Sequence, residues 1–458
     1  MGKSSSLLSI AITLLLLVHG YRAMEEETNQ QKQWQGQWGN ECQLDQLNVL
    51  EPSHVLKCEA GRIEIWDHHA PQLRCSGVSF DRIVIEPQGL YLPTYFNAPK
   101  LSFVVNGRGL MGRVIPGCAE TFMDSAGGQW QGQGFRDMHQ KVEHLRRGDT
   151  IANPAGISQW IHNNGNEPLI IVSVFDIGNN QNQLDRNPRA FHLAGNNPQG
   201  QVWLRKSQQE PQNNMFSGFD PQVLAQAFKI KLNTAQQLQN QKDNRGNIVR
   251  VQGPFGVIRP PVRGEQRQEQ DNGLEETFCT MRCTDNLDDP SRADVYKPQL
   301  GYISTLNSYT LPMLRFLRLS ALRGSLRNDA MVLPHWNVNA NEILYVTNGQ
   351  AHVQVVNDNG NRVFDQQISK GQLLAIPQGF AVAKTAQSER FEWISFKTND
   401  NAKINTLAGR TSVLRGLPLE VLTNGFQISV EEARRVKFNT LETTLTHSSG
   451  QSGRRSDA

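Results

Sequence analysis

The sequence lacks several features that would assign it directly to a functional class. Of its 458 residues only 19% are charged and 7% are aromatic, and the formal net charge is +3. No local run of Lys and Arg concentrates this charge, which argues against a dedicated nucleic-acid-binding surface. The nucleophile elbow G-x-S-x-G, the Walker A motif and the dinucleotide-binding fingerprint are also missing. Hydrolase and nucleotide-binding functions therefore have no support in the motifs.

Long hydrophobic runs are equally scarce. The longest lies near the N-terminus, where Lys3 precedes the apolar residues 7–18 and small residues follow at Gly20 and Ala23. An apolar run of about 12 residues is too short to span a bilayer and is typical of a secretory signal peptide. We therefore predict that residues 1–23 form a signal peptide, with cleavage between positions 20 and 23.

Cysteine is infrequent as well. The six cysteines are Cys42, Cys58, Cys75, Cys118, Cys279 and Cys283. A secreted protein can form disulfides, but six cysteines allow 15 pairings and the sequence alone does not choose among them. No second Cys/His pair at zinc spacing accompanies Cys279 and Cys283, which argues against a structural zinc site.

Side-chain nitrogen is what the sequence has in excess. It contains 41 Gln and 37 Asn, about 17% of the chain, together with 31 Arg. The hydrophobic content of 38% still supplies material for cores, so wholesale disorder is not expected. The composition therefore describes a folded protein that is unusually rich in nitrogen.

The chain also repeats itself. Three pairs of segments correspond in order: LSFVVNGRG (101–109) with ILYVTNGQA (343–351), GDTIANPAG (148–156) with GQLLAIPQG (371–379), and FKIKLNTAQQL (228–238) with FQISVEEARRV (426–436). These ordered matches indicate an internal duplication. The first half carries 19 extra residues between its first two segments, and the loop-like residues 125–135 account for most of them.

Each half shows strand signals first and helix signals later. Residues 351–356 alternate between apolar and polar side chains, and Asn359-Gly360 then favours a tight hairpin turn. Many short strands with Gly, Pro and Asn between them are typical of a barrel. Ser429 and Glu432 have the spacing of a helix capping box. The predicted fold is all-β with helical extensions, in which two β-barrels each carry a short helical segment.

The domain boundaries follow from these patterns. Residues 259–277 contain two prolines, dense polarity and no apolar periodicity, which predicts an exposed linker open to proteases. We expect an N-terminal domain with its helical extension at 40–250, a linker at 251–272, a C-terminal domain with its extension at 273–445, and a disordered tail at 446–458.

Two G-x5-P-x-G signatures are half of the cupin pattern, and longer segments narrow the match. These are NECQL from Asn40, PGCAETF from Pro116, FRDMHQKVEHLR from Phe135, NGLEETFC from Asn272 and NTLAGRTSVLRGLP from Asn405. From Asn40 to about Ser448 the chain resembles the legumin-type (11S) seed storage globulins of the cupin superfamily, and the cruciferins most closely. The resemblance implies a bicupin, with two jelly-roll barrels.

The resemblance also implies how the precursor is processed. The bond between Asn272 and Gly273 matches the one cut by a vacuolar asparaginyl endopeptidase, which would give an acidic chain and a basic chain. The family's bridges map onto Cys42–Cys75 within the acidic chain and Cys118–Cys279 between the two chains. Cys58 and Cys283 fall outside this scheme, and we expect free, buried thiols there rather than a third bridge.

The function implied is that of a nutrient reservoir. A protein of this family enters the secretory pathway, is stored in the protein storage vacuole of seed cells, and assembles with identical or related chains into trimers and then hexamers. Many members are food allergens. A small-ligand-binding bicupin and a metal-dependent bicupin enzyme are the alternatives. We expect no enzyme activity, cofactor, nucleic-acid partner or membrane span.

The residues at the metal-ligand positions of cupin enzymes bear on the choice between a nutrient reservoir and a metal-dependent enzyme. The family pattern requires two His and a Glu in the first signature and a His in the second. The corresponding residues are His335, Asn337, Glu342 and Val382 in the second barrel, and Tyr95, Asn97, Lys100 and Gln159 in the first. Two usual ligands of four seldom hold a catalytic metal, and a lysine repels a cation. Both barrels are therefore expected to be free of metal.

His68 and His69 are another apparent ligand pair. We expected them to lie in a strand, where adjacent side chains point to opposite faces. On that expectation they would not bind one ion together.

Overall fold

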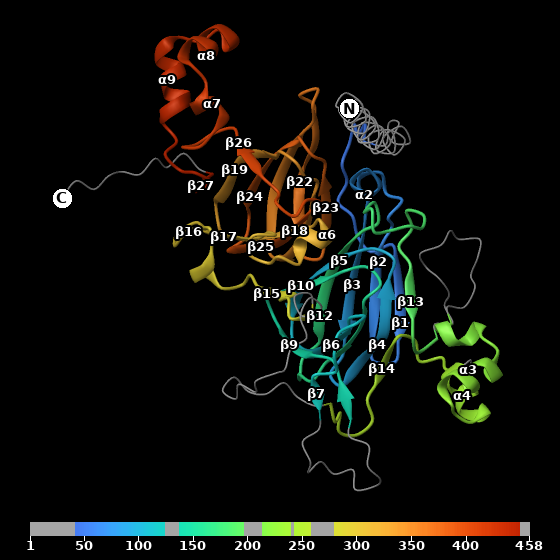
Figure 1. The fold of residues 1–458 in the computed structure, drawn as a ribbon. Helices are drawn as coiled ribbons and strands as arrows, with labels where there is room; N and C mark the ends of the chain where they lie inside the picture. Colours follow the sequence, from blue (N-terminus) through green and yellow to red (C-terminus); the bar gives the residue numbers. More distant parts are fainter. Residues whose placement is uncertain (1–41, 124–136, 197–212, 240–241, 258–278, 449–458) are drawn as a thin grey trace, which may run out of the picture. The chain divides into compact units, whose positions relative to one another are not determined.

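The computed structural model describes residues 42–123, 137–196, 213–239, 242–257 and 279–448 (Figure 1). The predicted signal peptide 1–23, the Asn272–Gly273 bond and most of the predicted linker lie outside the described residues. The insert at 125–135 and the end of the predicted tail lie outside them too.

Two antiparallel sheets build the first half. One has the strand order β1 (His54–Cys58), β2 (Gly61–Trp66), β3 (Val78–Ile85), β12 (Leu169–Asp176), β5 (Lys100–Asn106), β10 (Asp149–Asn153), β15 (Thr284–Asn286); the other has β13 (Ala190–His192), β4 (Gly89–Phe96), β11 (Ser158–His162), β6 (Arg108–Val114), β9 (Val142–Arg146), with β14 (Ile248–Arg250) also paired to β4. Ile83 and Val104 from the first sheet form one buried cluster with Met111 and Ile161 from the second. The two sheets therefore face each other across a shared core, as in a jelly-roll barrel.

The second half repeats this arrangement. One sheet has the order β16 (Val295–Lys297), β17 (Gly301–Leu306), β18 (Ser320–Arg327), β25 (Arg390–Lys397), β20 (Glu342–Asn348), β23 (Leu373–Ile376); the other has β22 (Arg362–Ser369), β21 (Gln350–Val356), β24 (Ala381–Ala386), β19 (Ala330–Asn337), β26 (Ile404–Thr406), with β27 (Leu445–His447) also paired to β19. A two-stranded ladder, β7 (Phe122–Met123) with β8 (Met138–His139), lies outside these sheets. The predicted all-β fold with two barrels is confirmed.

The repeated G-x5-P-x-G signature has a backbone reason. Gly148 and Gly371 have φ of 87° and 89°, and Gly156 and Gly379 have φ of 77° and 82°. This left-handed region disfavours residues with a Cβ atom, so both turns that flank β10 and β23 select glycine. The duplication visible in the sequence therefore reflects the same pair of turns made twice.

Helices follow the strands in each half. They are α3 (Pro221–Phe228) and α4 (Leu232–Gln239) in the first, and α7 (Val413–Gly416), α8 (Leu419–Phe426) and α9 (Val430–Phe438) in the second; the shorter ones are α2 (Pro71–Ser76), α6 (Leu314–Leu317) and the 3₁₀ turns η1 (Met215–Gly218) and η3 (Pro290–Arg292). Figure 1 shows both main groups standing away from the sheets. At the start of α9, Ser429 and Glu432 form the predicted capping box, which is confirmed.

The sheet that contains β3 and the sheet that contains β20 pack on each other through their outer faces. Phe80 and Leu101 of the first half belong to the same buried cluster as Ile343, Tyr345 and Phe396 of the second. The ring of Phe80 lies 5.5 Å from that of Tyr345 and 6.2 Å from that of Phe396. Much of the apolar surface of each half is therefore buried against the other half rather than inside its own barrel.

The two halves also exchange short N-terminal arms. Leu50, from the start of the first half, pairs with Leu373 of β23 in the second barrel through hydrogen bonds of 2.8 and 3.0 Å. In return, β15 from the start of the second half extends the first barrel's sheet along β10. The predicted boundary at residue 273 therefore does not follow the sheets, because β15 lies beyond it in sequence but belongs to the first barrel's sheet.

Candidate functional site

The second barrel brings the expected ligand residues together but surrounds them with lysines. Glu342 begins β20 and has no exposed surface. Its Oε1 accepts a hydrogen bond from Lys384 Nζ at 2.6 Å, and its Oε2 forms an ion pair with Lys397 Nζ at 2.7 Å. Both lysines are at most 4% exposed. Two internal ammonium groups therefore neutralise the carboxylate that a metal ion would need.

Neutral groups complete this cluster. Ser395 Oγ donates to Glu342 at 2.6 Å, and Asn337 Nδ2 donates to its second oxygen at 3.1 Å. Asn337 Oδ1 accepts in turn from Lys397 Nζ at 2.6 Å. The carboxylate thus has partners on both oxygens, which is how buried charges are usually stabilised.

The pKa values of the three titratable groups are all lowered, but for different reasons. Burial alone would raise the pKa of Glu342, but the two lysines hold it well below its ordinary value. Burial lowers the pKa of Lys397 to about 8, against the opposing pull of Glu342. Burial, with the nearby charge of Lys384, also lowers the pKa of His335 to about 4. The imidazole is therefore neutral near pH 7 while the carboxylate is ionised.

Lys384 and Lys397 were not among the predicted site residues. Val382 of β24, which occupies the fourth metal-ligand position of the cupin pattern, is buried. It lies two residues before Lys384 and therefore on the same face of the strand. The sequence did hold a signal, because each lysine follows a largely apolar stretch of its strand. A charged residue at a core-facing position of such a pattern indicates a buried partner of opposite charge.

The first barrel has a different interior. Lys100 begins β5 and is 1% exposed. Its Nζ lies 4.8 Å from the ring centre of Phe96 and 5.0 Å from that of Phe175. Burial lowers the pKa of Lys100 and raises that of Asp81, and each charge opposes the other group's shift. The sequence analysis identified Lys100 but missed Asp81, which lies on β3 (Val78–Ile85).

The other predicted positions of this barrel have separate roles. Tyr95 stacks on Phe191 with ring centres 4.9 Å apart. Asn97 Nδ2 donates to Asn187 O at 3.0 Å, and Asn97 Oδ1 accepts from the backbone N of Arg189, so its amide tethers a loop. Tyr95 and Asn97 therefore serve packing and loop geometry here.

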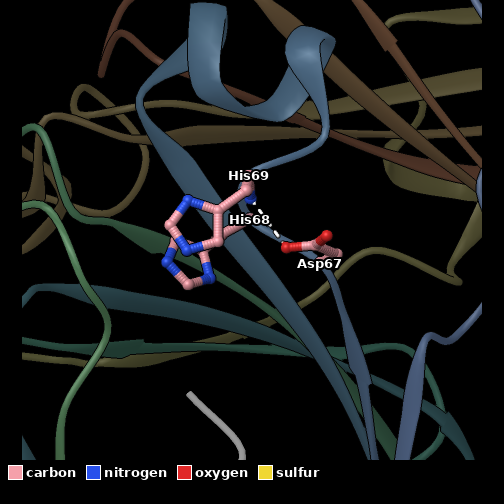
Figure 2. Close-up of side chains that lie close together, drawn as sticks. All are labelled: Asp67, His68 and His69. Atoms are coloured by element: carbon pink, nitrogen blue, oxygen red, sulfur yellow. Dashed lines mark hydrogen bonds between the residues drawn. The ribbon is translucent and has the colours of Figure 1, made fainter. Parts of the chain in front are cut away.

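The expectation that His68 and His69 lie in a strand was wrong. They lie in the turn between β2 and α2 rather than in a strand, and their ring centres are 4.0 Å apart (Figure 2). His68 is buried and His69 is exposed. Burial is the main reason why the pKa of His68 is lowered. Since a turn does not alternate its side chains between two faces, the adjacent imidazoles can share one side of the chain.

The cysteines divide into bonded and free. Cys118 and Cys279 form a disulfide across 161 residues of sequence. Cys42 and Cys75 are also disulfide-bonded. Cys58 and Cys283 are free, and burial raises the pKa of both thiols.

A cavity of about 310 Å³ opens on the outer side of the first barrel. Its lining includes Trp160, Phe255, Arg113 and His139. Arg113 is paired with Glu143. The cavity therefore combines aromatic walls with a compensated cation. Among the described residues no helix is long and apolar enough to cross a membrane.

Comparisons with known proteins give a consistent result. The family model described as "Cupin" matches residues 47–199 and 285–434. The chain is 72% identical to the 12S seed storage protein CRA1 of Arabidopsis thaliana, with 98% of each chain covered. It is 73% identical to the solved structure of procruciferin, an 11S globulin from Brassica napus, with a TM-score of 0.83, covering 90% of this chain and 99% of that one.

A further solved structure is the 11S globulin from Wrightia tinctoria, whose description reports an auxin binding site. It is 43% identical, with a TM-score of 0.80, covering 89% of this chain and 96% of that chain. All of these comparisons span both barrels.

Proposed function

Because the chain belongs to the 11S seed storage globulins of the cupin family, we propose that it is a reserve of nitrogen and amino acids in seeds. The observation that carries the proposal is the composition of the folded domains. Gln and Asn make up about 17% of the chain, and they occur in the strands and helices as well as in the loops. A protein selected for catalysis has no comparable need for amide nitrogen, whereas a reserve does.

The proposal predicts a time course in seeds. The protein should accumulate during maturation and be degraded within days of germination, which immunoblots of staged seeds would measure. Seedlings that lack it should grow less on medium without nitrogen. Persistence of the protein through seedling growth would contradict a reserve function. Stoichiometric Mn or Fe in the purified protein would instead favour the enzyme alternative.

We further propose that the protein enters the secretory pathway, reaches the storage vacuole and is cut after Asn272 by an asparaginyl endopeptidase. The exchanged arms and the Cys118–Cys279 disulfide support this step, because they join the halves independently of the peptide chain between them. Gel electrophoresis of seed extract with and without reductant tests the cut. The expected band near 50 kDa splits only on reduction, and an Asn272→Gln variant should stay whole. One unsplit band in the wild type would refute the processing step.

The exchanged arms predict that the two chains stay together after the cut even without the disulfide between them. We expect a cut protein with Cys118→Ser and Cys279→Ser to elute as one species in native size-exclusion chromatography, because β15 and Leu50 still pair across the halves. Urea should then separate the two chains. Separation without denaturant would show that the disulfide alone holds them.

Assembly into trimers, and into hexamers after the cut, is the third part of the proposal. The two main helix pairs expose equivalent apolar residues: Val223, Phe228, Leu232 and Leu238 on α3 and α4, and Val421, Phe426, Val430 and Val436 on α8 and α9. The first set is 37–52% exposed and the second is 46–59% exposed. Two similar apolar patches on one chain allow each copy to bind the next, and such head-to-tail contacts give a closed trimer when each copy is rotated by a third of a turn from the last.

Substitution of one patch tests this contact. Phe426→Asp should convert the trimer to a monomer, because a carboxylate would be buried in an apolar interface. Leu184→Asp is the matched control, since Leu184 is 54% exposed outside the helices. Light scattering after size-exclusion chromatography measures the mass. A trimer that survives Phe426→Asp would place the interface elsewhere.

A second candidate function is the binding of a small aromatic ligand. The 310 Å³ cavity with Trp160 and Phe255 favours it, and the Wrightia tinctoria relative is described as having an auxin binding site. Calorimetric titration with indole-3-acetate should show binding that Trp160→Ala weakens at least tenfold. Equal affinity in the wild type and the variant would exclude this cavity as the binding site.

A further inference from the structure

The turn between β2 and α2 gathers three groups that can bind a metal ion. Asp67, His68 and His69 each offer one ligand atom, and these atoms all lie within 4.8 Å of one another (Figure 2). Two imidazoles and a carboxylate are the donor types of many zinc sites. We propose that this turn binds one divalent transition-metal ion, with zinc as the reference ion, which would give the protein a metal reserve in addition to its nitrogen.

His68 is already oriented for this role. It is 5% exposed, and its Nε2 lies 3.0 Å from Asn187 Oδ1. An amide oxygen only accepts hydrogen bonds, so Nε2 carries the proton and the lone pair is on Nδ1. The backbone of Asn187 is itself held in place, because its main-chain carbonyl oxygen accepts a hydrogen bond from Asn97 Nδ2 at 3.0 Å. A fixed partner of this kind is typical of metal-binding histidines.

The other two groups are exposed and can adjust. Zinc bonds of 2.0–2.1 Å at tetrahedral angles require ligand atoms about 3.3 Å apart. One ligand atom from each residue lies within 4.8 Å of the others, so a zinc-binding set has to contract by at most about 1.5 Å, and the exposed side chains of Asp67 and His69 have room to move. The ring planes are inclined by 38°, so the exposed His69 ring has to turn toward the ion. Asp67 Oδ1 accepts from the His69 backbone N at 2.9 Å, which leaves the second carboxylate oxygen as a ligand.

This turn also differs from the barrel interior in its charge. The second barrel places two ammonium groups on its carboxylate, which repel a cation. No lysine or arginine among the described residues forms an ion pair with Asp67, whereas the nearby carboxylate of Asp185 is paired with Arg189 at 2.6 Å. The carboxylate of Asp67 therefore suits a cation better than the barrel carboxylate, which two ammonium groups already neutralise.

Calorimetric titration of the full-length protein with zinc sulfate, after treatment with a chelator, tests the proposal. We expect one ion per chain in the wild type and its loss in His69→Ala. His144→Ala, which removes another exposed histidine on β9, is the matched control and should retain the ion. Asn187→Ala should retain the stoichiometry but weaken the affinity 10- to 100-fold, because it removes the group that orients His68. Magnesium should not bind.

Three results would overturn the proposal. These are no zinc binding by the wild type, equal binding by His69→Ala and the wild type, and an equal loss in His69→Ala and His144→Ala, which would indicate adventitious surface binding only. His69 and His144 are both exposed, so neither variant is expected to disturb folding. None of these results bears on the nitrogen-reserve proposal, whose test follows the protein in seeds.

Discussion

The two barrels place opposite charges at the same position of the repeat. Lys100 begins β5 of the first barrel, and Glu342 begins β20 of the second. Asp81 opposes the lysine in one case, whereas Lys384 and Lys397 bind the glutamate in the other. The duplication has therefore kept the strands but reversed the sign of the central charge. In each barrel the buried charge at this position has a partner of opposite charge, although the residue itself is a lysine in one barrel and a glutamate in the other.

The two buried carboxylates also differ in how well their surroundings stabilise the negative charge. Glu342 has hydrogen-bond partners on both oxygens, and its pKa is held well below the ordinary value, so its surroundings favour the anion. Asp81 is as deeply buried, but one of its oxygens has no hydrogen-bond partner among the described residues and its pKa is raised. Its surroundings therefore disfavour the anion. This contrast can be tested by removing each charge in turn.

Neutralising the carboxylates should give the largest difference. Glu342→Gln leaves two buried ammonium groups without a counter-ion and should lower the free energy of unfolding by about 3–5 kcal/mol. Asp81→Asn should lower it by less, about 1–3 kcal/mol, because it leaves one buried ammonium group, that of Lys100, without a counter-ion instead of two, and the anion it removes is poorly stabilised. Urea denaturation followed by tryptophan fluorescence measures both. Equal losses would contradict the contrast between the barrels.

The pH dependence of stability that arises from Lys397 in the second barrel should be a smaller effect than the loss of Glu342. The pKa of Lys397 is about 8 in the folded chain, below the ordinary value of 10.5. Between these values the unfolded chain binds more protons than the folded one, so the contribution of Lys397 to stability rises with pH. From pH 8 to pH 10 the wild type should gain roughly 1 kcal/mol per pH unit relative to Lys397→Met.

The matched control for this measurement is Lys370→Met, since Lys370 is exposed. Its difference from the wild type should stay constant over the same pH range. Denaturation midpoints in a series of buffers give both comparisons. A flat profile for Lys397→Met would indicate that the lysine keeps an ordinary pKa in the folded protein.

The smallest expected effect concerns the two helical extensions. The capping box of α9 uses Ser429 and Glu432, whereas the equivalent positions before and within α4 are Lys231 and Thr234. Ser429→Ala should cost about 1 kcal/mol of helix stability, and Lys231→Ser with Thr234→Glu should add up to about 1 kcal/mol to α4. Amide hydrogen exchange within each helix measures these changes. No change in α9 protection would show that packing, not the cap, sets its stability.

The sequence predicted much of the fold because many of its signals are local. The turn glycines Gly148 and Gly371 and the cap at Ser429 each depend on the backbone within a few residues. Lys100 was also recognisable from the cupin pattern as a residue that repels a cation. The sequence could not predict the partners of Glu342, because Lys384 and Lys397 meet it only through the register of β20 with other strands.

The histidine pair shows the same limit at short range. His68 and His69 are adjacent, yet whether they share a side depends on the β2–α2 turn, which the sequence did not distinguish from a strand. Asn187, which orients His68, is 119 residues away. The exchanged arms were equally hidden, since β15 and Leu50 contribute too few residues to carry a pattern of their own.

The sequence by itself therefore determined the duplication, the strand-and-helix order and the nitrogen-rich composition, because these depend on residue types and on spacings within one segment. Only the tertiary structure decided which charges meet inside each barrel, which arm completes which sheet and which side chains gather at the β2–α2 turn. The barrel charges, the arms and the contact of His68 with Asn187 all join residues far apart in the chain, and their free energy depends on burial and on distances that no single segment specifies.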